Sequence, residues 1–263
     1  MNRFRNSAVM IAALVAGSGP ASAETTPAAQ ARPVVVELFT SQGCSSCPPA
    51  DRLLSRLVAE MPGRVIPLAF HVDYWNRGGW TDPFSSHRWS ERQGAYARKF
   101  HLEGPYTPQA VIDGSLEMVG SREDKVRAAI ASDATKPSAA VAVRLAPEAA
   151  RVRVEVDVDR PEALRGKKLD LMVAIYETGL STAVERGENG GRTLRDDVVV
   201  RALTRAARIS AGPGQARATA EIALDKGWNR GGLGVAAFLQ DPWSLEICGA
   251  TAMALPAGGG ESR

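Results

Sequence analysis

Hydrophobic positions in the first part of the chain form short apolar runs separated by a segment of helical period. Residues 33–40 and 65–72 are apolar runs, a pattern typical of strands buried on both faces of a sheet. Between these runs, apolar side chains recur at helical spacing at Leu53, Leu54, Leu57, Val58 and Met61. Pro62 and Gly63 then end the predicted helix. This order predicts a βαβ unit whose two strands are parallel and whose crossover is right-handed.

The next stretch predicts a helix, a β-hairpin and a further helix. One helical face collects four larger side chains, those of Trp89, Gln93, Tyr96 and Phe100. Residues 109–112 and 116–119 predict the two strands of a hairpin, because Asp113 and Gly114 between them favour a tight turn. Residues 121–130 predict the last helix of this part. The order β-α-β-α-β-β-α indicates an α/β domain.

The period of the hydrophobic pattern changes to two beyond a proline-containing linker at residues 134–138. Residues 151–158 alternate strictly between polar and apolar side chains, as a half-buried strand does. Turns rich in Gly and Pro separate four further strand-like segments, at residues 169–176, 216–224, 233–239 and 246–253. Short strands joined in this way are typical of an antiparallel sandwich. We therefore expect an α/β domain over residues 32–135, followed by an all-β sandwich domain over residues 138–256.

The N-terminus carries the pattern of an export signal. Arg3 and Arg5 precede an apolar stretch over residues 7–17, and residues 21–23 (Ala-Ser-Ala) supply small side chains for cleavage. The apolar stretch is too short to span a bilayer as a permanent helix, although an uncleaved anchor is the alternative. We expect residues 1–23 to be a signal peptide and the protein to be periplasmic or secreted, with no stable membrane span.

The charge of the chain is nearly balanced once this signal is removed. The formal net charge is +3, and residues 1–23 hold two arginines and no acidic residue, so the mature chain carries +1. Basic residues occur mixed with acidic ones, which indicates solvated surfaces and gives no sign of a nucleic-acid partner. Only one Cys-x-x-Cys is present among Cys44, Cys47 and Cys248, so the cysteines do not form a disulfide framework. Cys248 lies in a predicted strand, where a small buried apolar side chain is expected.

The Cys44-Ser45-Ser46-Cys47 motif lies between a predicted buried strand and a predicted amphipathic helix. Unpaired N–H groups and the helix dipole lower the pKa of a cysteine at a helix start. Cys44 is the expected attacking thiolate and Cys47 the thiol that resolves the mixed disulfide. The alternatives are a permanently oxidised structural disulfide, half of a zinc site that lacks its second pair of ligands, and an incidental pair.

A second motif, Thr107-Pro108, stands just ahead of the predicted hairpin strand. A proline at a strand start, in a cis peptide, holds the preceding backbone open. That backbone is then available to pair with an extended substrate segment. The alternative is an ordinary loop with a trans proline.

Motifs across nearly the whole mature chain match one family. The matching stretches are residues 36–51, 71–75, 79–80, 82–84, 106–109, 187–189, 191–194 and 240–242. They resemble the thioredoxin superfamily in the first part. More specifically, they resemble a family of secreted bacterial proteins of unknown function with a thioredoxin-like fold (domain-of-unknown-function family number twelve twenty-three). The resemblance implies export and an α/β thioredoxin-like fold for the first domain, and it assigns no substrate.

Further site residues follow from this resemblance and from topology. Thioredoxins carry a buried acid near the position of Glu37, so the resemblance implies that Glu37 accepts a proton from Cys47; the alternative is an acid at a solvated strand edge. Asp73, Trp75 and Trp80 follow the end of the second predicted strand, where ligands of open α/β sheets bind. Together with Thr107 and Pro108 we expect them to form a substrate-binding wall, whereas simple loop packing is the alternative for the tryptophans.

These expectations combine into an exported thiol–disulfide oxidoreductase that needs no cofactor and holds no metal. Its substrate is expected to be a protein or a small thiol or disulfide, and a separate redox partner is expected to renew the cysteine pair. One alternative is a metallochaperone in which Cys44, Cys47 and His71 bind copper. Another is a non-catalytic envelope-binding module with an inert disulfide, in which the β-sandwich supplies the working surface.

Overall fold

The structure is a computed structural model that describes residues 32–210, 212 and 214–256. The expected signal peptide, residues 1–23, lies outside these described residues. Among the helices of the described part, none is both long enough and apolar enough to cross a membrane.

The first part of the chain folds into the strands and α-helices that its hydrophobic pattern predicts, and one 3₁₀ helix that was not predicted lies among them. In chain order they are β1 (Val34–Thr40), α1 (Pro48–Glu60), β2 (Val65–His71), the 3₁₀ helix η1 (Tyr74–Gly78), α2 (His87–Lys99), β3 (Gln109–Ile112), β4 (Leu116–Val119) and α3 (Glu123–Asp133). β1 and β2 are parallel, and β3 and β4 form an antiparallel hairpin. The βαβ unit and the hairpin are thus confirmed.

The second part contributes most of the strands. They are β5 (Ala140–Pro147), β6 (Arg151–Arg160), β7 (Leu169–Glu177), β8 (Leu180–Val184), β9 (Arg192–Asp196), β10 (Val199–Ile209), β11 (Gly214–Ala223), β12 (Leu233–Gln240) and β13 (Ile247–Ala254). Two short 3₁₀ helices, η2 (Glu162–Leu164) and η3 (Arg230–Gly232), interrupt them.

Strands from both parts form one mixed sheet of eight strands, in the order β13-β12-β7-β10-β2-β1-β3-β4. β10 joins the two parts, because it pairs with β7 along its length and with β2 where Val199 lies opposite Ala69. The described chain is therefore mostly β around a large mixed sheet. The expectation of an α/β thioredoxin-like domain followed by an all-β sandwich is wrong. A period of two in the sequence predicts a strand, but it does not say which strands pair.

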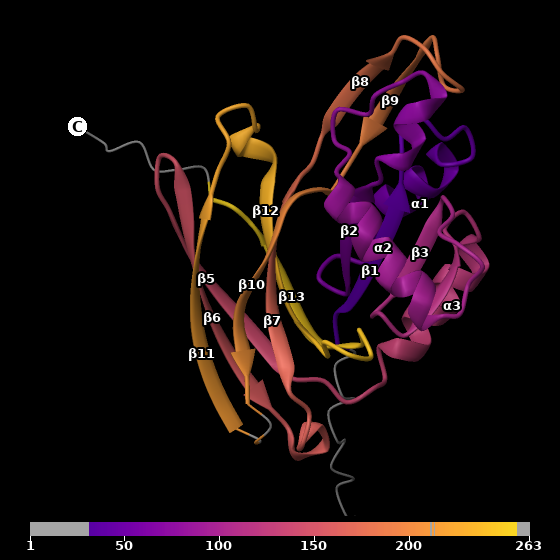
Figure 1. Ribbon diagram of the computed structural model, residues 1–263. Helices are drawn as coiled ribbons and strands as arrows, with labels where there is room; N and C mark the ends of the chain where they lie inside the picture. Colours follow the sequence, from indigo (N-terminus) through magenta and orange to yellow (C-terminus); the bar gives the residue numbers. More distant parts are fainter. Residues whose placement is uncertain (1–31, 211, 213, 257–263) are drawn as a thin grey trace, which may run out of the picture. The chain divides into compact units, whose positions relative to one another are not determined.

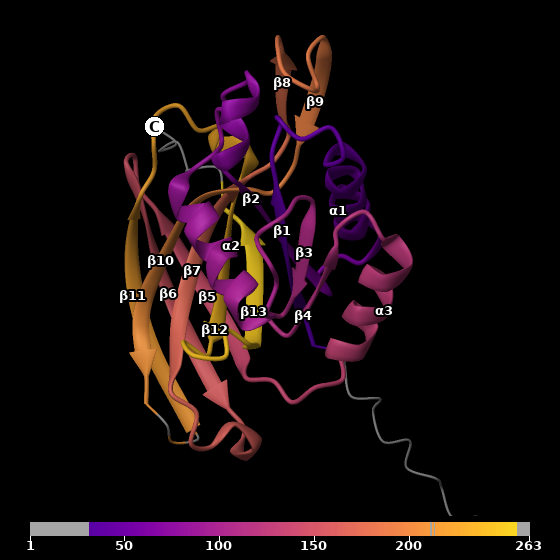
Figure 2. The same ribbon diagram turned by 45° about the vertical axis from the view of Figure 1, so that its right-hand side comes forward.

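Apolar clusters cover both faces of this sheet. On one face, α1 and α3 pack on the strands of the first part, and the three-stranded sheet β11-β6-β5 packs on β7, β10, β12 and β13. On the other face, α2 packs through Trp89 and Tyr96. Figure 1 shows the three-stranded sheet at the left and the helices at the right, and Figure 2 separates α2 from α1 and α3.

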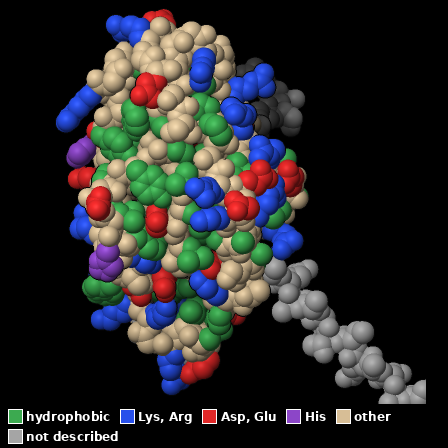
Figure 3. Space-filling view, turned by 90° about the vertical axis from the view of Figure 1, so that its right-hand side faces the viewer, with side chains coloured by type: hydrophobic (Ala, Val, Ile, Leu, Met, Phe, Trp, Pro, Cys, Tyr) green, Lys and Arg blue, Asp and Glu red, His purple; other side chains and the backbone are tan. Residues whose placement is uncertain are grey.

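β8 and β9 form a separate two-stranded sheet. This hairpin connects β7 to β10 and rises beyond the end of the large sheet, beside the start of α1 (Figures 1 and 2). On the side that carries the helices, basic and acidic side chains are interspersed rather than gathered by sign (Figure 3). The hairpin is the element of the second part that reaches the cysteine motif.

Candidate functional site

The cysteine motif forms a disulfide in the loop between β1 and α1. The Cα atoms of Cys44 and Cys47 are 5.5 Å apart. The loop makes two successive turns, because the N–H of Cys44 donates to the Ser41 carbonyl at 3.1 Å and the N–H of Cys47 donates to the Cys44 carbonyl at 3.3 Å. Cys47 is the N-cap residue of α1, and prolines occupy the first turn, where a missing N–H costs least. The expected position of the pair at a helix start is confirmed.

Both cysteines are buried, with relative exposed areas of 0 %. Ser45 and Ser46 between them are exposed. The Ser46 hydroxyl lies 3.3 Å from the sulfur of Cys44, where it can donate to a thiolate. The pair is therefore surrounded by protein except at its two serines.

Trp75 links the cysteine loop to the Thr107-Pro108 motif. The Thr107–Pro108 peptide bond is cis. The indole Nε1 of Trp75 donates to the Thr107 hydroxyl oxygen at 2.7 Å. On its other side Trp75 touches the loop so closely that a Cβ atom added to Gly43 would lie 3.3 Å from the Trp75 Cβ. The antiparallel pairing of β1 with β3 brings these segments side by side. The structure thus brings together the cysteines, Trp75, Thr107 and Pro108.

Gln42 is the polar centre of the loop. Its side-chain oxygen accepts from Trp80 Nε1 at 3.1 Å, and its Nε2 donates to Asp196 at 2.7 Å. Its backbone N–H donates to Asp82 at 2.8 Å. Trp80 therefore contacts the loop through Gln42, and two carboxylates remote in sequence fix the loop backbone and side chain.

A buried histidine lies between these two carboxylates. His71 Nδ1 is 2.8 Å from Asp82, and its Nε2 is 3.9 Å from Asp196. Burial alone would lower the pKa of the imidazole, but the carboxylates, Asp82 first, raise the pKa of His71 to about 9. His71 is therefore a buried imidazolium at neutral pH, as the cation of a small ionic cluster.

Asp51 brings a further carboxyl to this cluster from α1. Its N–H donates to the Cys47 carbonyl at 3.2 Å, and its Oδ1 accepts from the Thr40 hydroxyl at 2.8 Å. Burial raises the pKa of Asp51 to about 7, although His71 opposes this rise. A carboxyl one helical turn from Cys47 lies on the same helix face. Asp51 can therefore hold or give up a proton near neutral pH beside the cysteine pair.

Glu37 lies on the other face of the sheet. Alternation along β1 directs Glu37 toward α2, whereas α1 packs on the opposite face. Its carboxylate is fully buried, accepts from Arg92 Nε at 2.6 Å and from the Tyr96 hydroxyl, and is not at a solvated strand edge. The structure does not bring Glu37 to Cys47, because the sheet lies between them.

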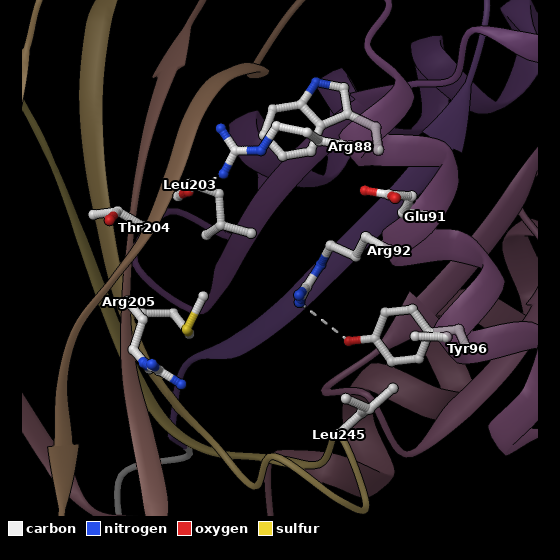
Figure 4. Close-up of a pocket in the computed structure, with 11 residues that line it drawn as sticks. Arg88, Glu91, Arg92, Tyr96, Leu203, Thr204, Arg205 and Leu245 are labelled. Atoms are coloured by element: carbon white, nitrogen blue, oxygen red, sulfur yellow. Dashed lines mark hydrogen bonds between the residues drawn. The ribbon is translucent and has the colours of Figure 1, made fainter.

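Arg92 and Tyr96 also line a cavity of about 430 Å³ on that face, between α2 and β10. Figure 4 shows the Arg92 guanidinium directed at the Tyr96 hydroxyl within this cavity, with Arg88 and Arg205 at its edges. The cavity is on the α2 face, so it is separate from the cysteine loop.

Asp73 orients the segment after β2 rather than the loop. One of its oxygens accepts from the Ser90 hydroxyl, and the other lies 3.2 Å from His87 Nδ1. The hydrogen bond from Ser90 holds the pKa of Asp73 below its ordinary value. Asp73 thus ties η1 to α2, and the structure does not bring it to the cysteines.

The tip of the β8–β9 hairpin supplies contacts that the sequence reasoning did not assign. Asn189 Nδ2 donates to the carbonyl oxygens of Gln42 and Cys44, both at 2.9 Å. A Glu188 oxygen accepts from the N–H of Ser45 at 2.9 Å. The only signal in the sequence was the presence of residues 187–189 among the family motifs.

The described residues contain no group of three or more His, Cys, Asp and Glu side chains arranged to hold a metal ion. The two nitrogens of His71 face Asp82 and Asp196, so they do not join the cysteine sulfurs as a copper site requires.

Cys248 is buried, its sulfur is 3.8 Å from the Leu239 carbonyl oxygen, and burial raises the pKa of its thiol to about 11. It behaves as the small buried side chain that was expected.

Comparison with known proteins supplies a family and a fold. A family described as "Protein of unknown function (DUF1223)" matches residues 35–240. No curated protein matches the chain. A solved structure from Agrobacterium tumefaciens is similar at 27% identity and a TM-score of 0.68, over 90% of this chain and 98% of that one. HBP35 of Porphyromonas gingivalis is similar in fold at 18% identity and a TM-score of 0.66, over 88% of this chain and 78% of that one.

Proposed function

The chain belongs to the DUF1223 family of proteins of unknown function, and we propose that it is an exported, periplasmic thiol–disulfide oxidoreductase that uses the Cys44–Cys47 pair. The observation that supports this function most is the short disulfide loop at the N-terminus of α1, joined through Trp75 to the cis Thr107–Pro108 peptide. We propose that the arrangement of this loop, helix start and proline is similar to that of the thioredoxin superfamily. The proposal does not extend to the architecture of the chain.

The reaction is an exchange between this disulfide and a substrate dithiol. A substrate thiolate attacks the sulfur of Cys44, the Cys44–Cys47 bond breaks, and Cys47 leaves with the electron pair. The second substrate thiolate then attacks the substrate sulfur of the mixed disulfide and releases Cys44. The substrate becomes a disulfide, and its two electrons stay on the two protein cysteines. The reverse sequence reduces a substrate disulfide.

The surrounding residues support each state of this exchange. The positive end of α1 and the Ser46 hydroxyl stabilise the Cys44 thiolate. Asp51, whose pKa is raised to about 7, gives a proton to the departing Cys47 sulfur and takes it back in the reverse direction. The backbone at Thr107 presents an edge on which an extended substrate segment pairs.

An inert structural disulfide in an envelope-binding module is the competing function. Full burial of both cysteines favours it, because a structural disulfide needs no access for a reacting thiol. The two functions differ in what happens when the disulfide meets a reduced protein substrate.

An assay of disulfide formation in a reduced, unfolded substrate protein distinguishes the oxidoreductase from the inert structural disulfide. The oxidised protein is mixed with the substrate, and the loss of free thiols is followed together with the reduction of Cys44–Cys47. We expect exchange by the wild type and by the matched control Cys248→Ser, and none by Cys44→Ser. Full exchange by Cys44→Ser, or none by the wild type, would show that the pair is not an oxidoreductase centre.

A further inference from the structure

The loop that holds the Cys44–Cys47 disulfide is bound by a segment far away in the sequence. Both cysteines are fully buried, and only Ser45 and Ser46 of the motif are exposed. The tip of the β8–β9 hairpin, residues 185–191, lies on this loop. A thiolate cannot attack a sulfur that it cannot contact, so a reactive disulfide here requires part of its cover to move.

Three hydrogen bonds hold the tip on the loop, and all of them reach the loop backbone. Asn189 is fully buried and donates to the carbonyl oxygens of Gln42 and Cys44 at 2.9 Å each. Its own Oδ1 accepts from Arg192 at 3.0 Å, which fixes the direction of the amide. Glu188 accepts from the N–H of Ser45 at 2.9 Å. Lifting the tip therefore removes partners from both residues of the Cys44-Ser45 segment.

The hairpin is built so that its tip can lift while its base stays fixed. Among the described strands, β8 and β9 pair only with each other. A two-stranded hairpin outside a larger sheet opens at low cost. The end of β9 is anchored, because its last residue, Asp196, accepts from Gln42 Nε2 at 2.7 Å and the next residue, Asp197, accepts from the Ser55 hydroxyl at 2.8 Å.

Glu188 also opposes the reactive state of Cys44. Its carboxylate places a negative charge at Ser45, the neighbour of Cys44, and a nearby like charge disfavours a thiolate. The closed tip therefore binds the backbone on both sides of Cys44 and disfavours the reduced, ionised form of Cys44.

We propose that residues 185–191 are a gate over the disulfide, with Asn189 and Glu188 as the positioning residues that keep it closed. The purpose of the gate rests on the proposed function. Its opening, however, is measured without any protein substrate, through the rate at which a small reductant reaches the disulfide.

The probe is tris(3-hydroxypropyl)phosphine, which carries no charge. The phosphine takes an oxygen atom from one water molecule, its electron pair cleaves the S–S bond, and both sulfurs leave as thiols. Asn189→Asp is nearly isosteric, but it sets a carboxylate against two carbonyl oxygens. Glu188→Gln keeps the length of the side chain and weakens the bond to Ser45. Glu185→Gln is the matched control, since Glu185 is exposed on the same tip and makes no hydrogen bond to the loop among the described residues.

We expect reduction of Asn189→Asp to be about tenfold faster than that of the wild type, and reduction of Glu188→Gln about threefold faster, as the loss of one or two hydrogen bonds predicts. The control should react at the wild-type rate. Circular dichroism of the aromatic side chains verifies folding, and Glu188→Gln decides the question if Asn189→Asp does not fold. A rate for Glu188→Gln equal to that of Glu185→Gln would overturn the gate.

The gate and the oxidoreductase function fail in different ways. Faster reduction of the variants, with no exchange by any form of the protein, upholds the gate and overturns the function. Exchange by the wild type, with equal reduction rates in all variants, overturns the gate and leaves the function in place.

Discussion

The backbone N–H of Asp51 donates to the carbonyl oxygen of Cys47 at 3.2 Å, so the partly buried carboxyl of Asp51 lies one helical turn from the N-cap residue of α1. Burial raises the pKa of this carboxyl to about 7. Asp51 therefore makes the stability of the fold depend on pH. It also places a group that can bind a proton beside the cysteine pair.

The free energy of unfolding of the wild type should fall between pH 4 and pH 7, and Asp51→Asn should remove this fall. In this range native Asp51, with a pKa of about 7, keeps its proton, whereas in the unfolded chain it ionises near 3.8. The unfolded state therefore binds fewer protons, and wild-type stability falls as pH rises, by on the order of 2–4 kcal/mol. Urea unfolding of both proteins at pH 4.5 and 7.5 measures the difference. An unchanged pH dependence in Asp51→Asn would contradict the burial of a protonated Asp51.

Asp82→Asn should lower the pKa of His71 from about 9 toward or below its ordinary 6.5, because burial then outweighs the remaining carboxylates. In the wild type the stabilisation from the imidazolium is complete below pH 6.5 and is lost as pH rises to about 9. Nitrogen NMR of His71 across pH 5–10 reports both midpoints. A midpoint that stays near 9 in Asp82→Asn would show that Asp82 is not the main partner.

Glu37→Gln should destabilise the fold by about 3–5 kcal/mol, because it leaves the Arg92 guanidinium largely buried without its counter-charge. Arg92→Met should cost a similar amount, since it leaves Glu37 unpaired. Arg88→Met, one turn earlier on α2, is the control and should change stability by less than about 1 kcal/mol. Equal effects of Arg92→Met and Arg88→Met in urea unfolding would mean that the buried pair contributes nothing specific.

Trp75 and Thr107 should act as a unit in substrate exchange. Trp75→Phe keeps an aromatic ring and the Cβ atom that lies against Gly43, but it loses the N–H from which Thr107 accepts at 2.7 Å, and Thr107→Val loses the acceptor. We expect each change to lower kcat/KM for a dithiol peptide, and the double variant to be no worse than either one. The coupling free energy in this cycle should be about 0.5–1.5 kcal/mol. Strictly additive losses would show that the bond does not hold the cis-proline segment for the substrate.

The sequence predicted the elements of the first part and the cysteine and proline motifs, because these depend on neighbouring residues. It did not predict β10, the strand that joins the two parts. The register of β10 shifts twice against β7, after Val200 and after Arg205, so its apolar residues do not alternate as in a regular strand. Without β10, the pattern favoured two separate domains rather than one sheet.

Contacts between residues far apart in the sequence were also missed at the cysteine site. Cys44 and Cys47 are visible in the sequence as a motif, whereas Asn189 and Asp196 reach the loop from a hairpin more than a hundred residues away. Glu37 was the more conspicuous acid, because it interrupts an apolar run. Which helix covers each face of the sheet depends on tertiary packing, and α2 packs on the face of Glu37, whereas Asp51 is held near Cys47 by their hydrogen bond in the first turns of α1.

The reduction potential of the Cys44–Cys47 couple is the most direct test of whether this pair exchanges electrons with substrates. It is measured by equilibrating the Cys248→Ser protein with glutathione or dithiothreitol redox buffers and quantifying the reduced fraction after acid quenching and alkylation. We predict a value between about −270 and −120 mV, the range of catalytic pairs. A value below about −300 mV would identify a structural disulfide and contradict the proposed function.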